Sequence, residues 1–353
     1  MTNGLLPTGF RDRLPPEADA SARLVRCVLD SIASYGYERV QTPLAEFEVS
    51  LTEALGTSSR DLLRFVDPVS GETMAVRSDI TGQVGRIASS RMGHHPRPLR
   101  LSYGGPVVKL RSTQLRPERE MMQVGAELIG LDTIPAASEV INVAIEALKM
   151  AGVTDITLDL TLPDLIDVLA PSGDVAILKD RLDAKDAAAV PPDFAPLIAA
   201  AGPFASALER LRAFDGSGVL ASRLDALEAI VAVLPADIKV TLDPTELHGF
   251  EYQTWLGFSL FSSVASGEIG RGGSYRIGDE PAIGFSAFID PLIDAGLAQA
   301  ERRRLFLPLG TAPETAAKLR SEGWVTVAAL SEDDSAEAQI CSHIFSGTLP
   351  VAC

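Results

Sequence analysis

The segment at residues 100–130, RLSYGGPVVKLRSTQLRPEREMMQVGAELIG, constrains the fold more than any other part of the chain. It begins and ends with largely apolar runs that are typical of strands, and a strongly charged stretch separates the two runs. This arrangement predicts a loop between two strands that return on each other. We therefore expect strands at residues 99–108 and 121–128, joined by a charged loop.

The composition indicates a folded protein with a large core. Of 353 residues, 46% are hydrophobic and 22% are charged, which allows one large domain or two smaller ones. No apolar run reaches the roughly 18 residues of a membrane span, and the N-terminus lacks the pattern of a signal peptide. The cysteines Cys27, Cys341 and Cys353 lack the spacing of a metal site or a disulfide framework. We expect a cytoplasmic protein with reduced thiols, no metal site and no membrane contact.

The charge balance disfavours nucleic-acid binding. With 31 basic and 47 acidic residues the formal net charge is −16, and nucleic-acid binding depends mainly on neutralising phosphates with Lys and Arg. The densest basic run, from Arg86 to Arg100, contains no interleaved aromatic residue on which bases could stack. We interpret it as a solvated face or a partner-binding surface, and contact with nucleic acid or nucleotide stays open as the alternative.

Apolar periodicity predicts the helices and the remaining strands of the first half. Residues Ala18 to Ile32 include apolar positions three and four apart, typical of an amphipathic helix that begins after Pro15-Pro16 and is stopped by Gly36. A second helix is expected at 138–150, with Ser138 as its N-cap. Short apolar segments predict further strands at 37–42, 73–77, 156–162 and 238–242.

The predicted secondary structure changes twice in the second half of the chain. Residues 165–234 are rich in Ala, Leu and Asp and interrupted by Pro and Gly, which predicts several short helices without a chemical constellation. Strand patterns return at 250–261 and 283–288, separated by a predicted glycine turn at 270–273 and followed by a helix near Pro291. The tail predicts two strands around one helix at 313–321, which is too little for an independent doubly wound domain.

Three segments resemble the signature motifs of class II aminoacyl-tRNA synthetases, and of histidyl-tRNA synthetase in particular. Residues 100–130 are similar to motif 2, and GFSAFIDPLID at 284–294 is similar to motif 3. The order of LPTGFRD, a long helix and a strand near the N-terminus is similar to motif 1, a dimer-forming element. The resemblance covers about residues 5–300.

This resemblance implies an α/β (α+β) protein with a class II synthetase-like core. The core would span residues 1–300, with a mixed, largely antiparallel sheet flanked by helices and a helical insertion at 165–234. A short C-terminal α/β segment would follow at 301–353.

Several positions match histidine-binding positions of the synthetase. Asp79 and Thr81 lie in a segment similar to LRPEGT and would hold the ligand ammonium, which has three donors and no acceptor. Gln123 and Glu127 match Q-G-E on one face of a strand, where Gln123 would bridge the head group and Glu127 would accept from an imidazole N–H. Tyr275 would reach the other ring nitrogen.

The resemblance adds Lys109 and Tyr252 to this predicted histidine site. From the residues alone, Glu127 has an alternative interpretation, as a carboxylate paired with a neighbouring arginine on a solvated sheet face.

Three positions depart from the synthetase pattern where its chemistry needs arginine. Lys109 replaces the arginine that grips the ATP α-phosphate, His248 the arginine that acts during adenylate formation, and Pro291 the ATP-binding arginine of motif 3. Lysine lacks the guanidinium fork, imidazole is largely neutral at a reference pKa of about 6.5, and proline has no donor. Because losing one such donor costs about two to four orders of magnitude in rate, we expect no catalytic residues. The alternative for His248 is a core or interface histidine.

This combination resembles the ATP phosphoribosyltransferase regulatory subunit family, which is paralogous to histidyl-tRNA synthetase. The resemblance implies a non-catalytic subunit without its own cofactor that activates a short-form catalytic subunit in a hetero-octamer. The subunit would be needed for feedback inhibition by L-histidine and would self-associate as a dimer through about residues 10–65. Mg²⁺ would accompany only the partner's substrates, and tRNA would not bind. The alternatives are an active histidyl-tRNA synthetase or other amino-acid-adenylating enzyme, and a stand-alone histidine-sensing module.

Overall fold

The computed structural model describes residues 5–53, 59–110, 118–170, 175–247, 249, 252–300 and 303–353. The chain forms two compact units, Met1–Ala298 and Gln299–Cys353. Among the described helices, none is long and apolar enough to cross a membrane.

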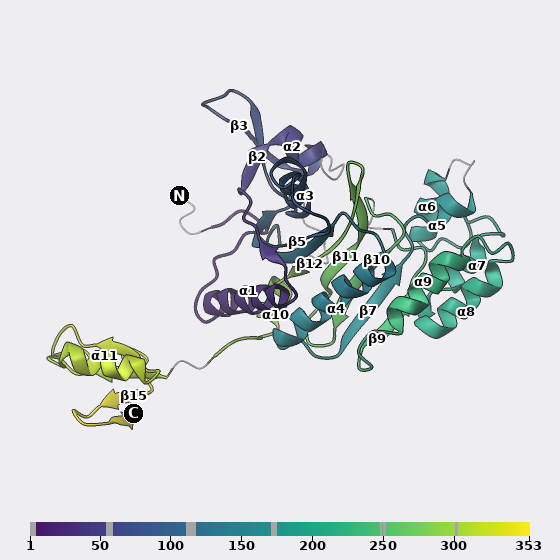
Figure 1. Ribbon diagram of the computed structural model, residues 1–353. Helices are drawn as coiled ribbons and strands as arrows, with labels where there is room; N and C mark the ends of the chain where they lie inside the picture. Colours follow the sequence, from purple (N-terminus) through teal and green to yellow (C-terminus); the bar gives the residue numbers. More distant parts are fainter. Residues whose placement is uncertain are drawn as a thin grey trace. The chain divides into compact units, whose positions relative to one another are not determined.

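A nine-stranded sheet is the base of the larger unit (Figure 1), with the strand order β1-β5-β6-β12-β11-β10-β7-β9-β8. Its strands are β1 (Glu38–Arg39), β5 (Leu99–Val108), β6 (Glu120–Ile129), β7 (Ile156–Thr161), β8 (Gly202–Pro203), β9 (Lys239–Leu242), β10 (Gly257–Ser262), β11 (Glu268–Ile277) and β12 (Glu280–Phe288). Neighbours are antiparallel, except that β1 with β5 and β7 with β9 are parallel. The predicted mixed, largely antiparallel sheet is confirmed, and the pair β5–β6 is the one that the segment at 100–130 predicts.

Two long helices cover one face of this sheet. The helices α1 (Glu17–Ser34) and α4 (Ile134–Met150) pack against each other and against β5, β6 and β12. Every second residue of β6 supplies this main core: Val124, Ala126 and Leu128 are buried there. Because strand side chains alternate between faces, Gln123 and Glu127 must project from the opposite face.

The opposite face carries a second, smaller core. The helix α3 (Thr81–Ser90) packs there, and its Val84 contributes to a cluster with residues of β5, β6, β11 and β12. A three-stranded antiparallel sheet, in the order β2-β4-β3, precedes α3 in the chain. The sheet and the helices within the same segment are β2 (Ala45–Phe47), α2 (Glu48–Glu53), η1 (Ser59–Asp61), β3 (Leu63–Val66) and β4 (Thr73–Val76).

Arg77 fixes the chain between β4 and α3. Its buried guanidinium donates to the carbonyl of Pro106 at 2.8 Å and to the Thr42 hydroxyl at 2.7 Å. Gly105 provides the space, because a Cβ at that position would lie 2.2 Å from Arg77 Nη2. These contacts hold residues 78–81 over the sheet.

The predicted helical insertion folds as short helices beside β7 and β9 (Figure 1). They are α5 (Leu165–Leu169), α6 (Ala176–Asp183), α7 (Ala195–Ala199), α8 (Phe204–Phe214) and α9 (Ala221–Val231). Buried leucines at helical spacing, such as Leu208 with Leu211 and Leu224 with Leu227, join these helices to the main core.

The predicted start of α4 is wrong. The helix begins at Ile134, and the Thr133 side chain caps it by accepting from the backbone N–H of Ala136 at 3.4 Å. Ser138 lies inside the helix. The physical reason is Pro135, which lacks an N–H and therefore fits the first turn rather than a position before the helix.

Two strand predictions also need correction. The strand expected at 250–261 is β10, which begins only at Gly257; residues 250 and 251 lie outside the described part of the chain, and 252–256 do not form a strand. The strand expected at 37–42 comprises only Glu38–Arg39.

The predicted glycine turn at 270–273 is wrong, because these residues lie inside β11. Its glycines permit close packing, since a Cβ on Gly272 would lie 2.3 Å from the carbonyl of Gly284.

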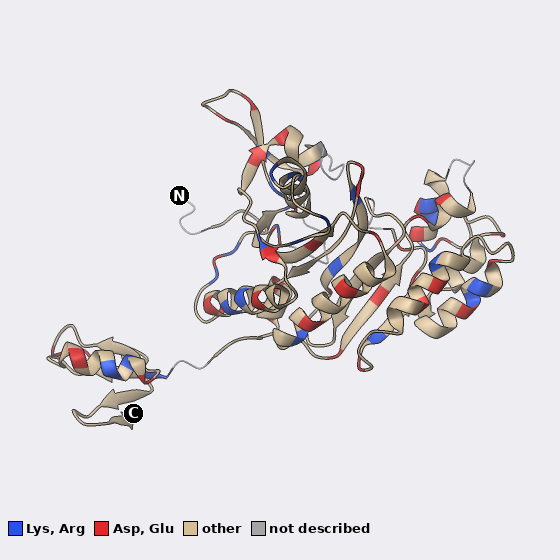
Figure 2. Ribbon diagram, in the orientation of Figure 1, with Lys and Arg blue, Asp and Glu red and all other residues tan. Residues whose placement is uncertain are grey.

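Ion pairs account for much of the basic run from Arg86 to Arg100. Arg86 pairs with Glu46, Arg97 with Glu280 and Arg100 with Glu139. Figure 2 likewise shows basic and acidic residues intermingled along α1 and α8. The paired carboxylates offset the charge that phosphate contacts would need, which favours the interpretation as a solvated or partner-facing surface.

The C-terminal unit has its own four-stranded sheet, in the order β14-β13-β15-β16. The elements are β13 (Arg304–Leu307), α11 (Pro313–Ser321), β14 (Val325–Ala328), β15 (His343–Phe345) and β16 (Pro350–Ala352). The predicted strands and helix correspond to β13, α11 and β14. The three-residue strands β15 and β16 are not predicted, because they are too short to show alternation.

Candidate ligand-binding site

The candidate site lies on the sheet face opposite α1 and α4. The strand register aligns Glu127 of β6 with Gly284 of β12 and, one strand further, with Gly273 of β11. Two residues along each strand, Gly125, Ser286 and Arg271 are aligned in the same way. All these positions share one face because side chains alternate along a strand. The face combines glycines, which leave space, with polar side chains that line it.

Glu127 is the buried centre of the site. Its carboxyl group accepts hydrogen bonds from Tyr103 at 3.0 Å and from Tyr275 at 2.7 Å. Burial raises the pKa of Glu127 to about 8, and the two tyrosine hydrogen bonds act in the opposite direction. Burial and the neighbouring Glu127 charge raise the pKa of both tyrosines, so their hydroxyls stay protonated and donate. The interpretation of Glu127 as half of a solvated arginine pair is wrong.

A glycine makes this burial possible. A Cβ on Gly284 would lie 1.6 Å from Glu127 Oε2, so no other residue fits beside the carboxyl group without a shift. Gly125 has the same role for Tyr103, whose hydroxyl oxygen lies 2.5 Å from where a Cβ would stand.

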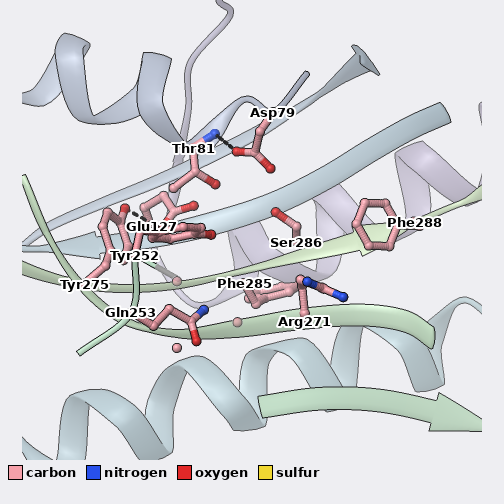
Figure 3. A pocket seen from close by; sticks show the side chains of 13 residues that line it. Asp79, Thr81, Glu127, Tyr252, Gln253, Arg271, Tyr275, Phe285, Ser286 and Phe288 are labelled. Carbon is pink, nitrogen blue, oxygen red and sulfur yellow. Dashed lines mark hydrogen bonds between the residues drawn. The ribbon is translucent and has the colours of Figure 1, made fainter. Parts of the chain in front are cut away.

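Asp79 and Thr81 lie above the sheet at the start of α3, as Figure 3 shows. The Asp79 carboxylate accepts from the backbone N–H of Thr81 at 2.7 Å and from the side-chain amide of Gln123 at 2.8 Å. Gln123 also donates to the Ser286 hydroxyl at 2.6 Å and accepts from the backbone N–H of Ile80 at 3.0 Å. Gln123 is fully buried and holds Asp79 in place rather than lining the cavity.

Two adjoining cavities form the cleft. The inner one, about 30 Å³, is the size of a single water site and is bordered by Glu127, Tyr275 and Thr81. The outer one, about 320 Å³, includes Lys109 and is within the range of small-molecule sites. Asp79, Tyr252, Arg271 and Phe288 border both. Glu127 and Tyr275 border the inner cavity only.

Arg271 is a cation of the cleft that the sequence analysis does not select, because the glycines at 270, 272 and 273 predict a turn there. It lines both cavities and forms two hydrogen bonds with Glu268, at 2.7 and 2.6 Å. Tyr103, Gln253 and Ser286 were also missed. Tyr103 had a detectable signal, because a strand that pairs with β6 places it on the same face as Glu127.

The three departures from the synthetase pattern have different locations. Lys109 lines the outer cavity, with its ammonium 5.9 Å from the centre of the Phe288 ring. Pro291 lies in the first turn of α10 (Asp290–Asp294) and is not among the residues that line either cavity. His248 lies outside the described residues.

Beside Pro291, Asp290 accepts from the backbone N–H of Met122 and pairs with Arg13, so this turn now carries structural contacts. Among the described residues, no group of three or more His, Cys, Asp or Glu side chains is placed to hold a metal ion.

The sheet, its motif-like strands and the cleft define a protein with the class II aminoacyl-tRNA synthetase fold. The family model described as histidyl-tRNA synthetase matches residues 9–292. The structure is similar to that of an ATP phosphoribosyltransferase regulatory subunit/histidyl-tRNA synthetase from Bacillus halodurans, with a TM-score of 0.82 at 23% identity over 96% of each chain. It is also similar to histidyl-tRNA synthetase from Nostoc, with a TM-score of 0.76 at 16% identity over 98% of this chain and 91% of the other.

The sequence relatives identify one family within this fold class. The chain is 42% identical to the ATP phosphoribosyltransferase regulatory subunit of Rhodospirillum centenum, over 97% of this chain and 95% of the relative. It is 44% identical to that of Paramagnetospirillum magneticum, over 95% and 93%. The chain belongs to the ATP phosphoribosyltransferase regulatory subunit family, a branch of the histidyl-tRNA synthetase fold.

The raised pKa of Glu127 predicts a pH-dependent stability that Glu127→Gln removes. Between pH 4.5 and about 8 this group is ionised in the unfolded chain and protonated in the folded one. The folded state therefore holds more protons, and stability falls as pH rises through this window, by up to several kcal/mol. Because glutamine cannot ionise, we expect the variant to gain stability relative to the wild type from about pH 5 to 8.

Urea unfolding of the wild type and of Glu127→Gln across this pH range measures the difference in their free energies of unfolding. Glu120→Gln, at the exposed end of the same strand, is the matched control and should keep the wild-type pH dependence. A difference between Glu127→Gln and wild type that stays constant with pH would contradict the assignment.

Proposed function

We propose that this chain is a non-catalytic regulatory subunit of ATP phosphoribosyltransferase that makes a short-form catalytic subunit active and sensitive to L-histidine. The observation that carries the proposal is a contrast between the polar groups of the cleft and three positions that depart from the synthetase pattern. The groups that suit an amino acid are present: Asp79 for an ammonium, and Glu127 with Tyr275 for a side-chain N–H. The arginines that adenylation needs are replaced at Lys109, His248 and Pro291.

Binding of histidine in this cleft follows from the same chemistry. The ligand ammonium pairs with Asp79 and Thr81, the imidazole N–H donates to Glu127, and Tyr275 meets the other ring nitrogen, with Tyr252 packed edge-on against Tyr275. Gln123 acts through Asp79, which it holds by a hydrogen bond. Lys109, in the outer cavity, supplies positive charge near the head group.

The assembly that we propose is a hetero-octamer of this chain and the catalytic subunit. ATP, phosphoribosyl pyrophosphate and Mg²⁺ bind to the catalytic partner, and this chain holds neither a cofactor nor tRNA. The names of the relatives support the partnership, since each is called a regulatory subunit of that enzyme.

Loss of adenylation chemistry predicts that the chain alone does not catalyse histidine-dependent exchange between ATP and pyrophosphate. The physical reason is that each missing guanidinium removes stabilisation worth about two to four orders of magnitude in rate. The assay uses the purified chain with L-histidine and Mg²⁺, beside an authentic histidyl-tRNA synthetase as the positive control. Exchange at ordinary synthetase rates would favour the alternative, an active adenylating enzyme.

The proposed histidine contact predicts that Glu127→Gln weakens inhibition more than activation. Above about pH 8, where the Glu127 carboxyl group is ionised in the folded chain, its hydrogen bond to the histidine N–H contributes about 1.5–3 kcal/mol, so the inhibition constant should rise about ten- to a hundredfold in this range. Reconstituted transferase assays with increasing L-histidine measure the inhibition constant and the basal activation, with Glu120→Gln as the control. An unchanged inhibition constant, with basal activation intact, would place the effector at another site.

Self-association as a dimer through residues 10–65 is the last element of the proposal. This region exposes large apolar side chains, including Leu14, Phe47, Val49 and Phe65, and such a surface is typical of an interface. We expect the chain to sediment as a dimer at micromolar concentration, because a closed two-fold contact is the common solution for one patch.

Phe65→Asp should shift the dimer toward monomer, whereas Val264→Asp, an exposed site outside the region, should not. Sedimentation of the wild type as a strict monomer, or equal behaviour of the two variants, would count against this interface.

A further inference from the structure

Arg271 occupies the part of the cleft next to the segment that lost its arginine. Its Nη1 donates to the carbonyl of Gly249 at 3.0 Å, and Gly249 directly follows His248 in the chain. Gly249 has a φ of +83°, and a Cβ on it would lie 1.6 Å from Nη1. Glycine is therefore required at this position for the guanidinium to stand there.

An ion pair with the buried Glu268 fixes the orientation of this guanidinium. Glu268 accepts from Arg271 Nε and Nη2, and the Ser259 hydroxyl donates to the same carboxylate at 2.9 Å. A register shift between β10 and β11 pairs Phe261 with Glu268 and Leu260 with Gly270, leaving Ile269 as a bulge. The bulge brings Glu268 to the same face as Arg271. Because Glu268 holds the Nε–Nη2 edge, Nη1 is directed toward residue 249 and the cleft.

Arg271 lies where the α-carboxylate of an amino acid in the cleft would need a cation. In the strand register Arg271 is two residues, or about 7 Å, along from the level of Glu127. Figure 3 shows Glu127 and Tyr275 toward one end of the cleft and Arg271 toward the other, beside Ser286. Asp79 is an acceptor for an ammonium, and Glu127 lies where a side chain would end. A carboxylate needs a cation, and among the described lysines and arginines Arg271 alone borders both cavities.

We propose that Arg271 is a specificity-determining residue that binds the α-carboxylate of the amino-acid effector. This inference rests on the proposed function, since it requires an amino acid in the cleft. The guanidinium would supply carboxylate recognition from β11. Lys109 contributes charge but borders only the outer cavity.

The test compares two ligands that differ only at the carboxylate. L-Histidinol carries a hydroxymethyl group there, so the ratio of its Kd to that of L-histidine measures carboxylate recognition. Calorimetry on the purified full chain should give a ratio of about ten- to a hundredfold in the wild type. In Arg271→Gln the ratio should fall to near one, mostly through weaker binding of L-histidine. Arg276→Gln, an exposed arginine on the same strand, should keep the wild-type ratio.

A second variant separates recognition from folding. Arg271→Gln with Glu268→Gln removes both charges of the pair, leaving no buried carboxylate without a partner, and should show the same ratio near one. A wild-type ratio retained in Arg271→Gln, or equal weakening of both ligands in both variants, would overturn the role of Arg271 and leave the proposed function intact. If neither ligand binds the wild type, the proposed effector site fails, and this inference fails with it.

Discussion

Burying the Glu127 carboxyl group in the middle of a sheet costs free energy that the surrounding residues have to offset. Two tyrosine hydroxyls donate to its oxygens, and Gly284 leaves the space that it occupies. The same network continues from Tyr103 to Ser286 and from there through Gln123 to Asp79. Residues on four strands and the start of α3 are therefore positioned relative to one buried acid.

This network explains which groups of the cleft match the synthetase pattern and which positions depart from it. The polar groups around Glu127 and Asp79 hold one another by hydrogen bonds, so replacing one would leave others buried without partners. Lys109 and Pro291 lie outside this network, at the outer cavity and in the first turn of α10. Such positions can change without disturbing the buried polar groups. The proposed function, amino-acid binding without adenylation, is physically consistent with this separation.

The sequence predicted the central strands well because their signal is local. The strands β5 and β6 alternate or run apolar over ten residues each, and Gln123 and Glu127 follow from their spacing on β6. Arg271 could not be found in this way. Its neighbours Gly270, Gly272 and Gly273 suggest a turn, and only the packing against β10 and β12 shows that they form a strand.

Other site features depend on contacts between distant segments. The role of Gln123 as the support of Asp79 joins residues 44 positions apart, and no local pattern encodes it. The pairing of Arg86, Arg97 and Arg100 with carboxylates elsewhere in the chain is of the same kind. The N-cap at Thr133 was within reach of the sequence, since the proline two residues later marks the first helical turn.

We propose that this chain has no chemistry of its own and acts by controlling a catalytic partner. The most direct measurement is the ATP phosphoribosyltransferase rate of a short-form catalytic subunit, alone and with this chain, over a range of L-histidine concentrations. The mixture should be more active than the catalytic subunit alone, and L-histidine should inhibit only the mixture. A catalytic subunit whose rate and histidine response are the same with and without this chain would contradict it.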